Sequence, residues 1–262
     1  MKRRDFLKTS AGLSSALLLR PSLEPLFAAT GGSDSGEVKA YQPGESISPA
    51  AFVLDKEMNQ HTVLSLCQEN TEAMVNVLYI FGGGAMGKDK LGSIWCQDSF
   101  EDLQILRFIH MKYEDAPVQL IPVACAPVYS TQYYGHEKGI FLNEPDDSEK
   151  FKAAVEKFIE STQKSVDDGF IPVQPYLDVR LRLMFNRDED LKPGAGYGKI
   201  YPWQGRFRAD AETQKYGVPT IWLLNPDGMV LEKPFHGNYY RSDPWEINYT
   251  IVDVDQALQK YI

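Results

Sequence analysis

Two stretches of almost unbroken apolar residues stand out along the chain. "MVNVLYIF", residues 74–81, and "VQLIPVAC", residues 118–125, have the length of strands and predict strands buried on both faces. Between them, residues 100–113 carry apolar side chains at helical spacing, namely Leu103, Leu106, Ile109 and Tyr113. A strand, a helix and a second strand in this order favour two parallel strands joined by a helical crossover.

Shorter patterns predict the remaining elements. Residues 52–66, "FVLDKEMNQHTVLSL", predict two strands around a turn at 57–60. Residues 147–166 predict a helix, residues 171–185 a short extended piece with a helical turn after it, and residues 252–262 a last helix. Residues 219–235 predict a hairpin, because Asp227-Gly228 supplies its tight turn. The predicted fold class is α/β, a mixed central sheet flanked by helices, with an N-terminal hairpin extension and an inserted loop near 187–208.

The N-terminus has the pattern of an export signal. Lys2-Arg3-Arg4-Asp5-Phe6-Leu7-Lys8 closely matches the twin-arginine motif, and a weakly apolar stretch and a small-residue patch follow it. The alternative is a basic amphipathic helix. We therefore expect a signal peptide over 1–30, a linker over 31–40 and one domain over 41–262, in a protein that is periplasmic or otherwise exported by the twin-arginine route.

Charge and cysteine content narrow the function classes. Removing residues 1–28 would take away five basic and two acidic side chains, and so lower the formal charge from −9 to about −12. Such an acidic body repels nucleic acid and anionic lipid. No apolar run in the body reaches the length of a membrane span. In an oxidising compartment, three cysteines fit one disulfide and one free thiol; they are Cys67, Cys96 and Cys125.

The stretch between the strand and the helix, "FGGGAMGKDKLGSIWCQDSF", contains two motifs that compete. Gly82 to Lys88 spells the start of a phosphate-binding loop. However, Asp89 stands where that loop needs Ser or Thr, and its carboxylate would face phosphate oxygens. We therefore interpret 82–93 as a glycine-rich connection and the following residues, from Trp95 to Ser99, as a thiol site.

Several neighbours support a reactive Cys96. It lies close to the start of a helix, where backbone N–H groups and the helix dipole stabilise a thiolate, and Trp95 supplies an apolar wall. Against this, Ser99 with Asp102 resembles a capping box that would begin the helix at residue 100, and Asp98 would raise the pKa of the thiol. An inert cysteine therefore remains the alternative.

The chain resembles the thioredoxin-like superfamily, in particular its redoxin, peroxiredoxin and exported thiol–disulfide oxidoreductase members. The resemblance covers residues 41–262 and is carried by the leading hairpin, by "WCQDS" after the first buried strand and by "KYGVPTIWLLNPDGMV". It implies that Cys96 is the attacking thiol and that Pro219 is a cis-proline beside it. It also implies a substrate site formed by Trp95, Val218, Pro219 and Thr220.

This sequence departs from the family pattern at its second motif cysteine. Ser99 stands in that position, so Cys96 has no partner within the motif, and Ser99 is expected to donate a hydrogen bond to the thiolate. Resolution of an oxidised Cys96 would then fall to Cys125, which ends the second strand at the same sheet edge, or to an outside thiol. Asp89 also replaces the proline of the peroxiredoxin signature, while Ser93 roughly satisfies its threonine.

The expected function is exchange or reduction of protein or small-molecule disulfides, or of peroxides, with an external thiol reductant and no cofactor. Metal binding has little support, since the histidines form no ligand grouping and only His136 is a candidate. The alternative is a non-catalytic module that holds a partner in the cleft or on the 187–208 insertion. In that insertion Arg206 and Phe207 belong either to a docking surface or to a loop that buries its own aromatics.

Overall fold

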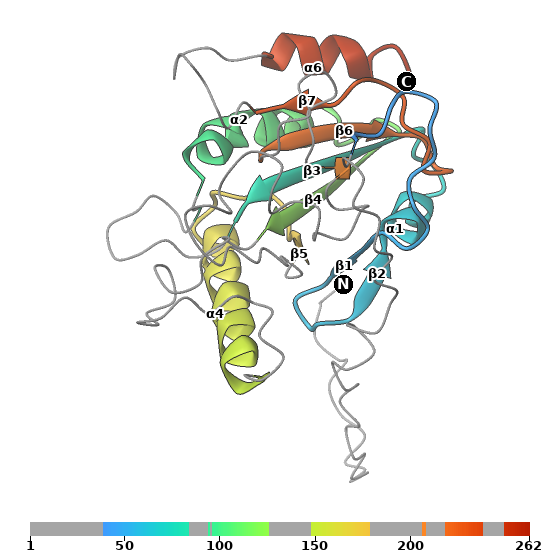
Figure 1. The fold of residues 1–262 in the computed structure, drawn as a ribbon. Helices are drawn as coiled ribbons and strands as arrows, with labels where there is room; N and C mark the ends of the chain where they lie inside the picture. Colours follow the sequence, from blue (N-terminus) through green and yellow to red (C-terminus); the bar gives the residue numbers. More distant parts are fainter. Residues whose placement is uncertain are drawn as a thin grey trace, which may run out of the picture. The chain divides into compact units, whose positions relative to one another are not determined.

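The computed structural model describes residues 39–83, 94, 96–125, 148–178, 206–207, 218–237 and 249–262. All of these belong to one compact unit, Asp34–Ile262 (Figure 1). The predicted signal peptide, most of the linker, Trp95, His136 and most of the 187–208 insertion lie outside the described residues.

The described strands form one mixed sheet. Its order is β2-β1-β5-β4-β3-β6-β7, with β3, β4 and β5 parallel and the other pairs antiparallel. This confirms the α/β prediction and the parallel pairing of the two apolar runs. The bounds are β1 Phe52–Leu54, β2 Gln60–Thr62, β3 Val75–Gly82, β4 Val118–Cys125, β5 Tyr176–Asp178, β6 Thr220–Leu224 and β7 Phe235–His236.

The described helices are α1 Val63–Glu69, α2 Gln97–Lys112, α4 Ser148–Asp167 and α6 Ile251–Leu258. One predicted element was wrong. The stretch after Thr62 is helical, because the Thr62 side chain accepts a hydrogen bond from the Ser65 N–H and caps α1. The start of α2, which the sequence left open, is at Gln97. No helix in the described part of the chain has the length and apolar character needed to cross a membrane.

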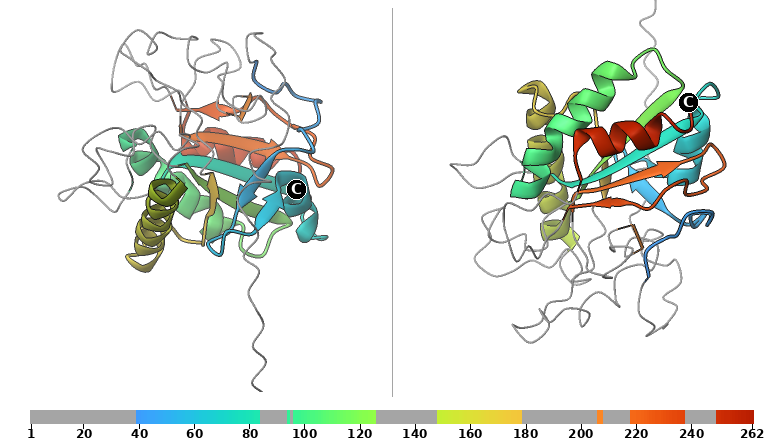
Figure 2. Two further views of the ribbon diagram at one scale, coloured as in Figure 1. Left: turned by 60° about the horizontal axis from the view of Figure 1, so that its bottom comes forward. Right: turned by 90° about the horizontal axis from the view of Figure 1, so that it is seen from above.

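Residues of β3 alternate between two buried faces of the sheet. Tyr79 and Phe81 are in ring contact on one face, which α2 covers. On the other face, the Asn76 amide donates to the Cys67 carbonyl in α1. Figure 2 shows α2 and α6 lying across the sheet side by side. Lys112 and Tyr113 tie these two helices together through their bonds to Asp255.

The hairpin predicted at 219–235 forms in part. The Gly228 N–H donates to the Asn225 carbonyl, and Gly228 has a φ of +74°, which favours glycine. Beyond this turn the returning chain makes isolated bridges, from Met229 to Ser46 and from Val230 to Leu224, before β7 pairs with β6 at Thr220 and Ile221.

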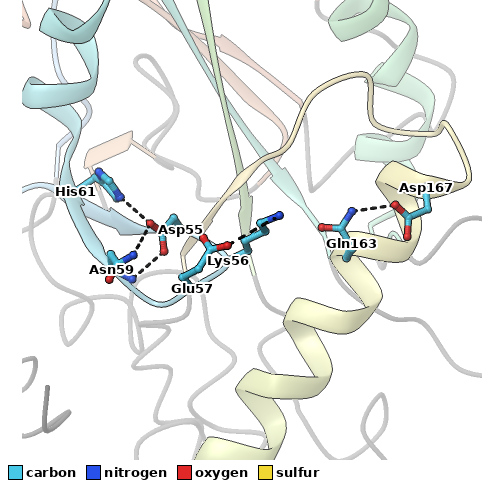
Figure 3. Close-up of polar contacts among 7 residues, drawn as sticks. All are labelled: Asp55, Lys56, Glu57, Asn59, His61, Gln163 and Asp167. Carbon is cyan, nitrogen blue, oxygen red and sulfur yellow. Dashed lines mark hydrogen bonds and ion pairs between the residues drawn. The ribbon is translucent and has the colours of Figure 1, made fainter. Parts of the chain in front are cut away.

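Asp55 organises the turn between β1 and β2 (Figure 3). Its carboxylate accepts hydrogen bonds from the Asn59 backbone and side chain at 2.8 and 2.9 Å, and His61 Nε2 lies 3.0 Å away. Burial alone would raise the pKa of Asp55, but the bonds from His61 and Asn59 outweigh it and lower the pKa below its ordinary value. The ionised carboxylate is therefore the form that stabilises this turn.

We predict that Asp55→Asn lowers the free energy of unfolding at pH 7 by about 0.5–1.5 kcal/mol, since a charged acceptor is lost. Because the pKa of Asp55 is lowered in the folded protein, this contribution is present above the ordinary carboxyl pKa and disappears as pH falls through the folded value. Urea denaturation at pH 7 and at about pH 3 measures both effects. Asp227→Asn, in the exposed β6–β7 turn, is the control, and equal losses at the two pH values would contradict the prediction.

Candidate thiol site

Cys96 occupies the N-cap position of α2, immediately after the glycine-rich connection. The capping box expected from Ser99 and Asp102 is not formed, because both residues already lie inside the helix. The Cys96 side chain makes no cap hydrogen bond, but the backbone N–H groups of Asp98 and Ser99 act on its sulfur and lower the pKa of the thiol. The open N-terminal donors of α2 are thus directed at a thiol, an arrangement that stabilises negative charge on sulfur.

Ser99 connects this thiol to the end of β3. It is fully buried, and its Oγ accepts a hydrogen bond from the Gly82 N–H at 2.9 Å. The same side chain hydrogen-bonds to Cys96. A hydroxyl has one proton to donate, so with Gly82 on its acceptor side Ser99 has its proton for the sulfur. This geometry permits the role that the sequence suggested for Ser99, which stays a prediction.

The second wall of the site comes from the start of β6. Cys96 Sγ lies 3.5 Å from the Val218 carbonyl oxygen, and the Val218–Pro219 peptide bond is cis. In the reduced protein the thiol donates to that carbonyl. The predicted neighbourhood of Cys96, Val218 and Pro219 is therefore present in the structure.

Burial dominates the electrostatics of Cys96. The residue is 6 % exposed, and desolvation raises the pKa of the thiol above its ordinary value. The Ser99 hydroxyl and the backbone N–H groups of Asp98 and Ser99 lower the pKa, whereas the charge of Asp98 raises it further. The resting form is consequently the thiol, and the thiolate is a minor form that these donors stabilise.

A buried tyrosine lies next to this site and was missed in the sequence. Tyr79 on β3 is fully buried, and its hydroxyl has no hydrogen-bond partner among the described residues. Burial raises the pKa of Tyr79 well above its ordinary value, and the negative charges of Asp102 and Cys96 raise it further. Asp102 itself accepts a hydrogen bond from the Tyr249 hydroxyl. An unmade hydrogen bond at a buried hydroxyl costs about 1–3 kcal/mol, so this atom calls for an explanation.

Cys125 and Cys67 occupy different surroundings, and all three cysteines are free thiols. Cys125 is the register partner of Gly82, which confirms that it ends at the same sheet edge as the site. Its side chain, however, lies on the face opposite Tyr79, and its sulfur is 3.9 Å from Asp178 Oδ2. Cys67 lies in α1, where burial raises the pKa of its thiol to about 12.

Thr220 and the insertion meet on the other side of β6. The Thr220 hydroxyl and the Trp222 indole both donate to the Phe207 carbonyl, at 3.0 and 2.8 Å. Phe207 is buried against Tyr41, while Arg206 stacks on that tyrosine and pairs with Glu45 at 2.6 Å. At these two residues the insertion matches the alternative of a loop that buries its own aromatics.

Among the described residues no group of His, Cys, Asp and Glu has a geometry suited to a metal ion. His61 is paired with Asp55, and His236 is buried in β7.

No protein-family model matches the chain, and no curated protein does. Solved structures do resemble it. The thioredoxin domain of a thiol-disulfide oxidoreductase from Bacteroides vulgatus is 11% identical, with 85% of this chain and 99% of that chain covered and a TM-score of 0.40. A peroxidoxin from Mycobacterium tuberculosis is 10% identical, with 84% and 96% covered and a TM-score of 0.41. A thioredoxin-family thiol:disulfide interchange protein from Chlorobium tepidum is 10% identical, with 84% and 97% covered and a TM-score of 0.40.

Similarities this low carry no information on activity. The fold rests on the chain's own topology, the parallel β3–β4–β5 core, antiparallel β6 and β7, and a cis X–Pro bond facing the first turn of α2. This topology is consistent with the thioredoxin-like α/β fold predicted from the sequence.

We predict that Ser99→Ala slows alkylation of Cys96 by iodoacetamide at neutral pH by about tenfold, because a hydrogen bond to the thiolate is lost. In the wild type, the alkylation rate should keep rising with pH beyond the ordinary cysteine pKa of about 8.5, since burial raises the pKa of this thiol. Mass-resolved alkylation at Cys96 measures both. The matched control is Ser65→Ala in α1, and an unchanged rate in Ser99→Ala would show that the hydroxyl does not act on the sulfur.

Proposed function

We propose that this chain is an exported thiol redox protein in which Cys96 alone attacks the substrate. The observation that carries the proposal is the position of Cys96 Sγ, at the N-cap of α2 and 3.5 Å from the Val218 carbonyl. A thiolate at this position would have the Ser99 hydroxyl and the N-terminal N–H groups of α2 on one side, and the Val218 carbonyl on the other. The substrates are disulfides of proteins or small molecules, or peroxides, and Trp95 with the 218–220 backbone would contact them.

The single motif cysteine determines how the reaction continues after the attack. A disulfide R–S–S–R′ would give the mixed disulfide Cys96–S–S–R and release R′–S⁻, while a peroxide would give a sulfenic acid on Cys96. Neither product is resolved by Ser99, which has no sulfur. A second thiol must then attack. From the mixed disulfide it takes the R group into a new disulfide and frees the Cys96 thiolate. With the sulfenic acid it forms a mixed disulfide on Cys96 and releases water, and a further thiol then frees Cys96.

An outside thiol fits that second step better than Cys125. The Cys125 side chain lies on the opposite face of the sheet from Tyr79, fully buried and in contact with Asp178. Resolution by Cys125 would require the end of β4 to rearrange. We therefore assign the reductant role to an external thiol and keep Cys125 as the internal alternative.

The predicted export of the protein also supports a redox function for Cys96. The twin-arginine pattern at Arg3 and Arg4 would deliver the chain to an oxidising compartment, where disulfides and oxidants are available. The acidic body speaks against nucleic acid as a partner.

The second candidate is a non-catalytic binding module. Its supporting observation is that Cys96 is only 6 % exposed and that its pKa is raised. In such a module the contact between Cys96 and Val218 would only hold α2 against β6. A thiol that reacts with no oxidant in the folded protein would favour this function.

We predict that Cys96→Ser abolishes the reaction of the mature protein with small disulfides and with hydrogen peroxide. Cys125→Ser and Cys67→Ser should each keep the initial rate, because their thiols are buried away from the site. Thiol-specific mass spectrometry after timed exposure to each oxidant gives the measurement. If the wild-type Cys96 stays reduced under conditions that oxidise free cysteine, the redox proposal fails.

We also predict that Ser99→Cys creates a protein that closes a disulfide with Cys96. Residue 99 is buried beside Cys96 and already hydrogen-bonds to it, so a thiol there is poised to attack a mixed disulfide. Reduction of insulin disulfides by dithiothreitol should become faster than with the wild type. Phe100→Cys, one position further along α2, is the control that should gain nothing.

A further inference from the structure

The Tyr79 hydroxyl is a buried donor that faces the same side of the sheet as the thiol site. Tyr79 has no exposed surface, and it is held by ring contact with Phe81 and by pairing with Ile221 of β6. Its hydroxyl has no hydrogen-bond partner among the described residues, yet a phenol in a strand core normally finds one. The Tyr79 hydroxyl is thus a hydrogen-bond donor without an acceptor among the described residues.

The neighbouring polar atoms are already engaged. The Cys96 sulfur has the Ser99 hydroxyl, two backbone N–H groups and the Val218 carbonyl around it. The Asp102 carboxylate accepts from Tyr249. Cys96 and Asp102 are nevertheless the two groups whose negative charges act on the Tyr79 hydroxyl. In the reduced protein the Tyr79 proton therefore has no bond to the described groups around it.

Other unpartnered buried atoms have a simpler structural setting. Asn76 and Gln119 are register partners, and each uses its amide N–H to bond a carbonyl of α1. In each of these two side chains only the oxygen lacks a partner in the described part of the chain, so the other half is satisfied. The Thr162 hydroxyl in α4 also lacks a partner there. Tyr79 has no other polar side-chain atom that could be hydrogen-bonded instead. Among the buried atoms described as unpartnered, its hydroxyl is also the one that interacts electrostatically with Cys96.

We propose that the Tyr79 hydroxyl donates a hydrogen bond to an oxygen atom carried by Cys96 Sγ, and that hydroperoxides are accordingly the substrate class of this site. The inference rests on the proposed redox function of Cys96 and selects between its substrates. Sulfur is a weak acceptor whereas oxygen is a strong one, so a mixed disulfide would leave the Tyr79 proton unbonded and a sulfenic oxygen would bind it.

The step balances without any further oxidant. The Cys96 thiolate attacks the terminal oxygen of ROOH, the S–O bond forms and the O–O bond breaks. The sulfur is oxidised by two electrons and the peroxide is reduced to RO⁻. With the proton that the thiol released, the products are Cys96–S–OH and ROH. Tyr79 keeps its own proton and stabilises the new oxygen.

Tyr79 is suited to this role because it stays protonated. Burial and the two neighbouring negative charges raise the pKa of Tyr79 well above its ordinary value, so the phenol remains a donor wherever the thiol reacts. Since Cys96 is almost fully buried, a sulfenic acid formed there is also shielded from a second oxidant molecule.

The experiment compares wild type, Tyr79→Phe and Cys96→Ser in the mature protein. Tyr79→Phe should slow oxidation of Cys96 by hydrogen peroxide by about tenfold or more, and shorten the lifetime of the sulfenic acid trapped by dimedone, since one hydrogen bond to oxygen is lost. Its reaction with a small disulfide should stay at the wild-type rate. Mass spectrometry at Cys96 follows all three reactions.

Thermal unfolding separates this role from a structural one. Tyr79→Phe should keep or raise the melting temperature, because the hydroxyl makes no bond to the described residues of the reduced protein. Tyr41→Phe is the matched control: that buried hydroxyl accepts from the Ser48 N–H, so its loss should lower the melting temperature and leave sulfenic acid formation unchanged.

The outcomes are distinct. If Tyr79→Phe reacts with peroxide at the wild-type rate and keeps its sulfenic acid as long, the role of Tyr79 is overturned. If wild-type Cys96 reacts with disulfides but not with peroxide, the inference fails while the proposed function stands. If Cys96 reacts with neither, both fail.

Discussion

The hydrogen bond from the Gly82 N–H to Ser99 Oγ is the interaction on which the site depends. It joins the last residue of β3 to the first turn of α2, although the two residues are 17 positions apart in sequence. It keeps Ser99 buried and leaves its single proton for Cys96. With this bond the N-terminal N–H groups of α2 face the sulfur. Without it, the position at which the helix begins would no longer be tied to the end of the strand.

The same bond explains how a CxxS site stays ordered. A second cysteine at position 99 would offer the Gly82 N–H only a weak sulfur acceptor. The Ser99 hydroxyl is a strong acceptor for the buried Gly82 N–H and a donor for the Cys96 sulfur. The site therefore cannot form a local disulfide, but its thiol is held in place. The raised pKa of Cys96 shows the limit of this arrangement, because two backbone N–H groups and a hydroxyl do not fully offset burial and the charge of Asp98.

The sequence was sufficient for contacts that depend on periodicity and on chain order. The apolar runs predicted β3 and β4, and the helix between them predicted that they are parallel. Parallel pairing in turn predicted that Cys125 lies at the sheet edge near Cys96. The start of α2 was left open because the local Ser-x-x-Asp pattern favoured residue 100, whereas the bond between Ser99 and the distant Gly82 leaves no local pattern. Tyr79 was missed because the environment of its hydroxyl depends on α2, which carries Asp102, and not on its strand neighbours. Contacts such as Arg206 on Tyr41, between distant segments, leave no local pattern at all.

The bond between Cys96 and Val218 has a further consequence for the order of events. A thiol donates to the Val218 carbonyl, but a thiolate has no proton and would face that oxygen with negative charge. Ionisation of Cys96 therefore removes its hydrogen bond to Val218 and leaves the Val218 carbonyl able to accept another one. A substrate backbone N–H that binds the freed carbonyl would stabilise the ionised state, so substrate binding and thiolate formation favour each other. The raised pKa of Cys96, to which burial contributes most, thus describes the protein without a substrate on that carbonyl.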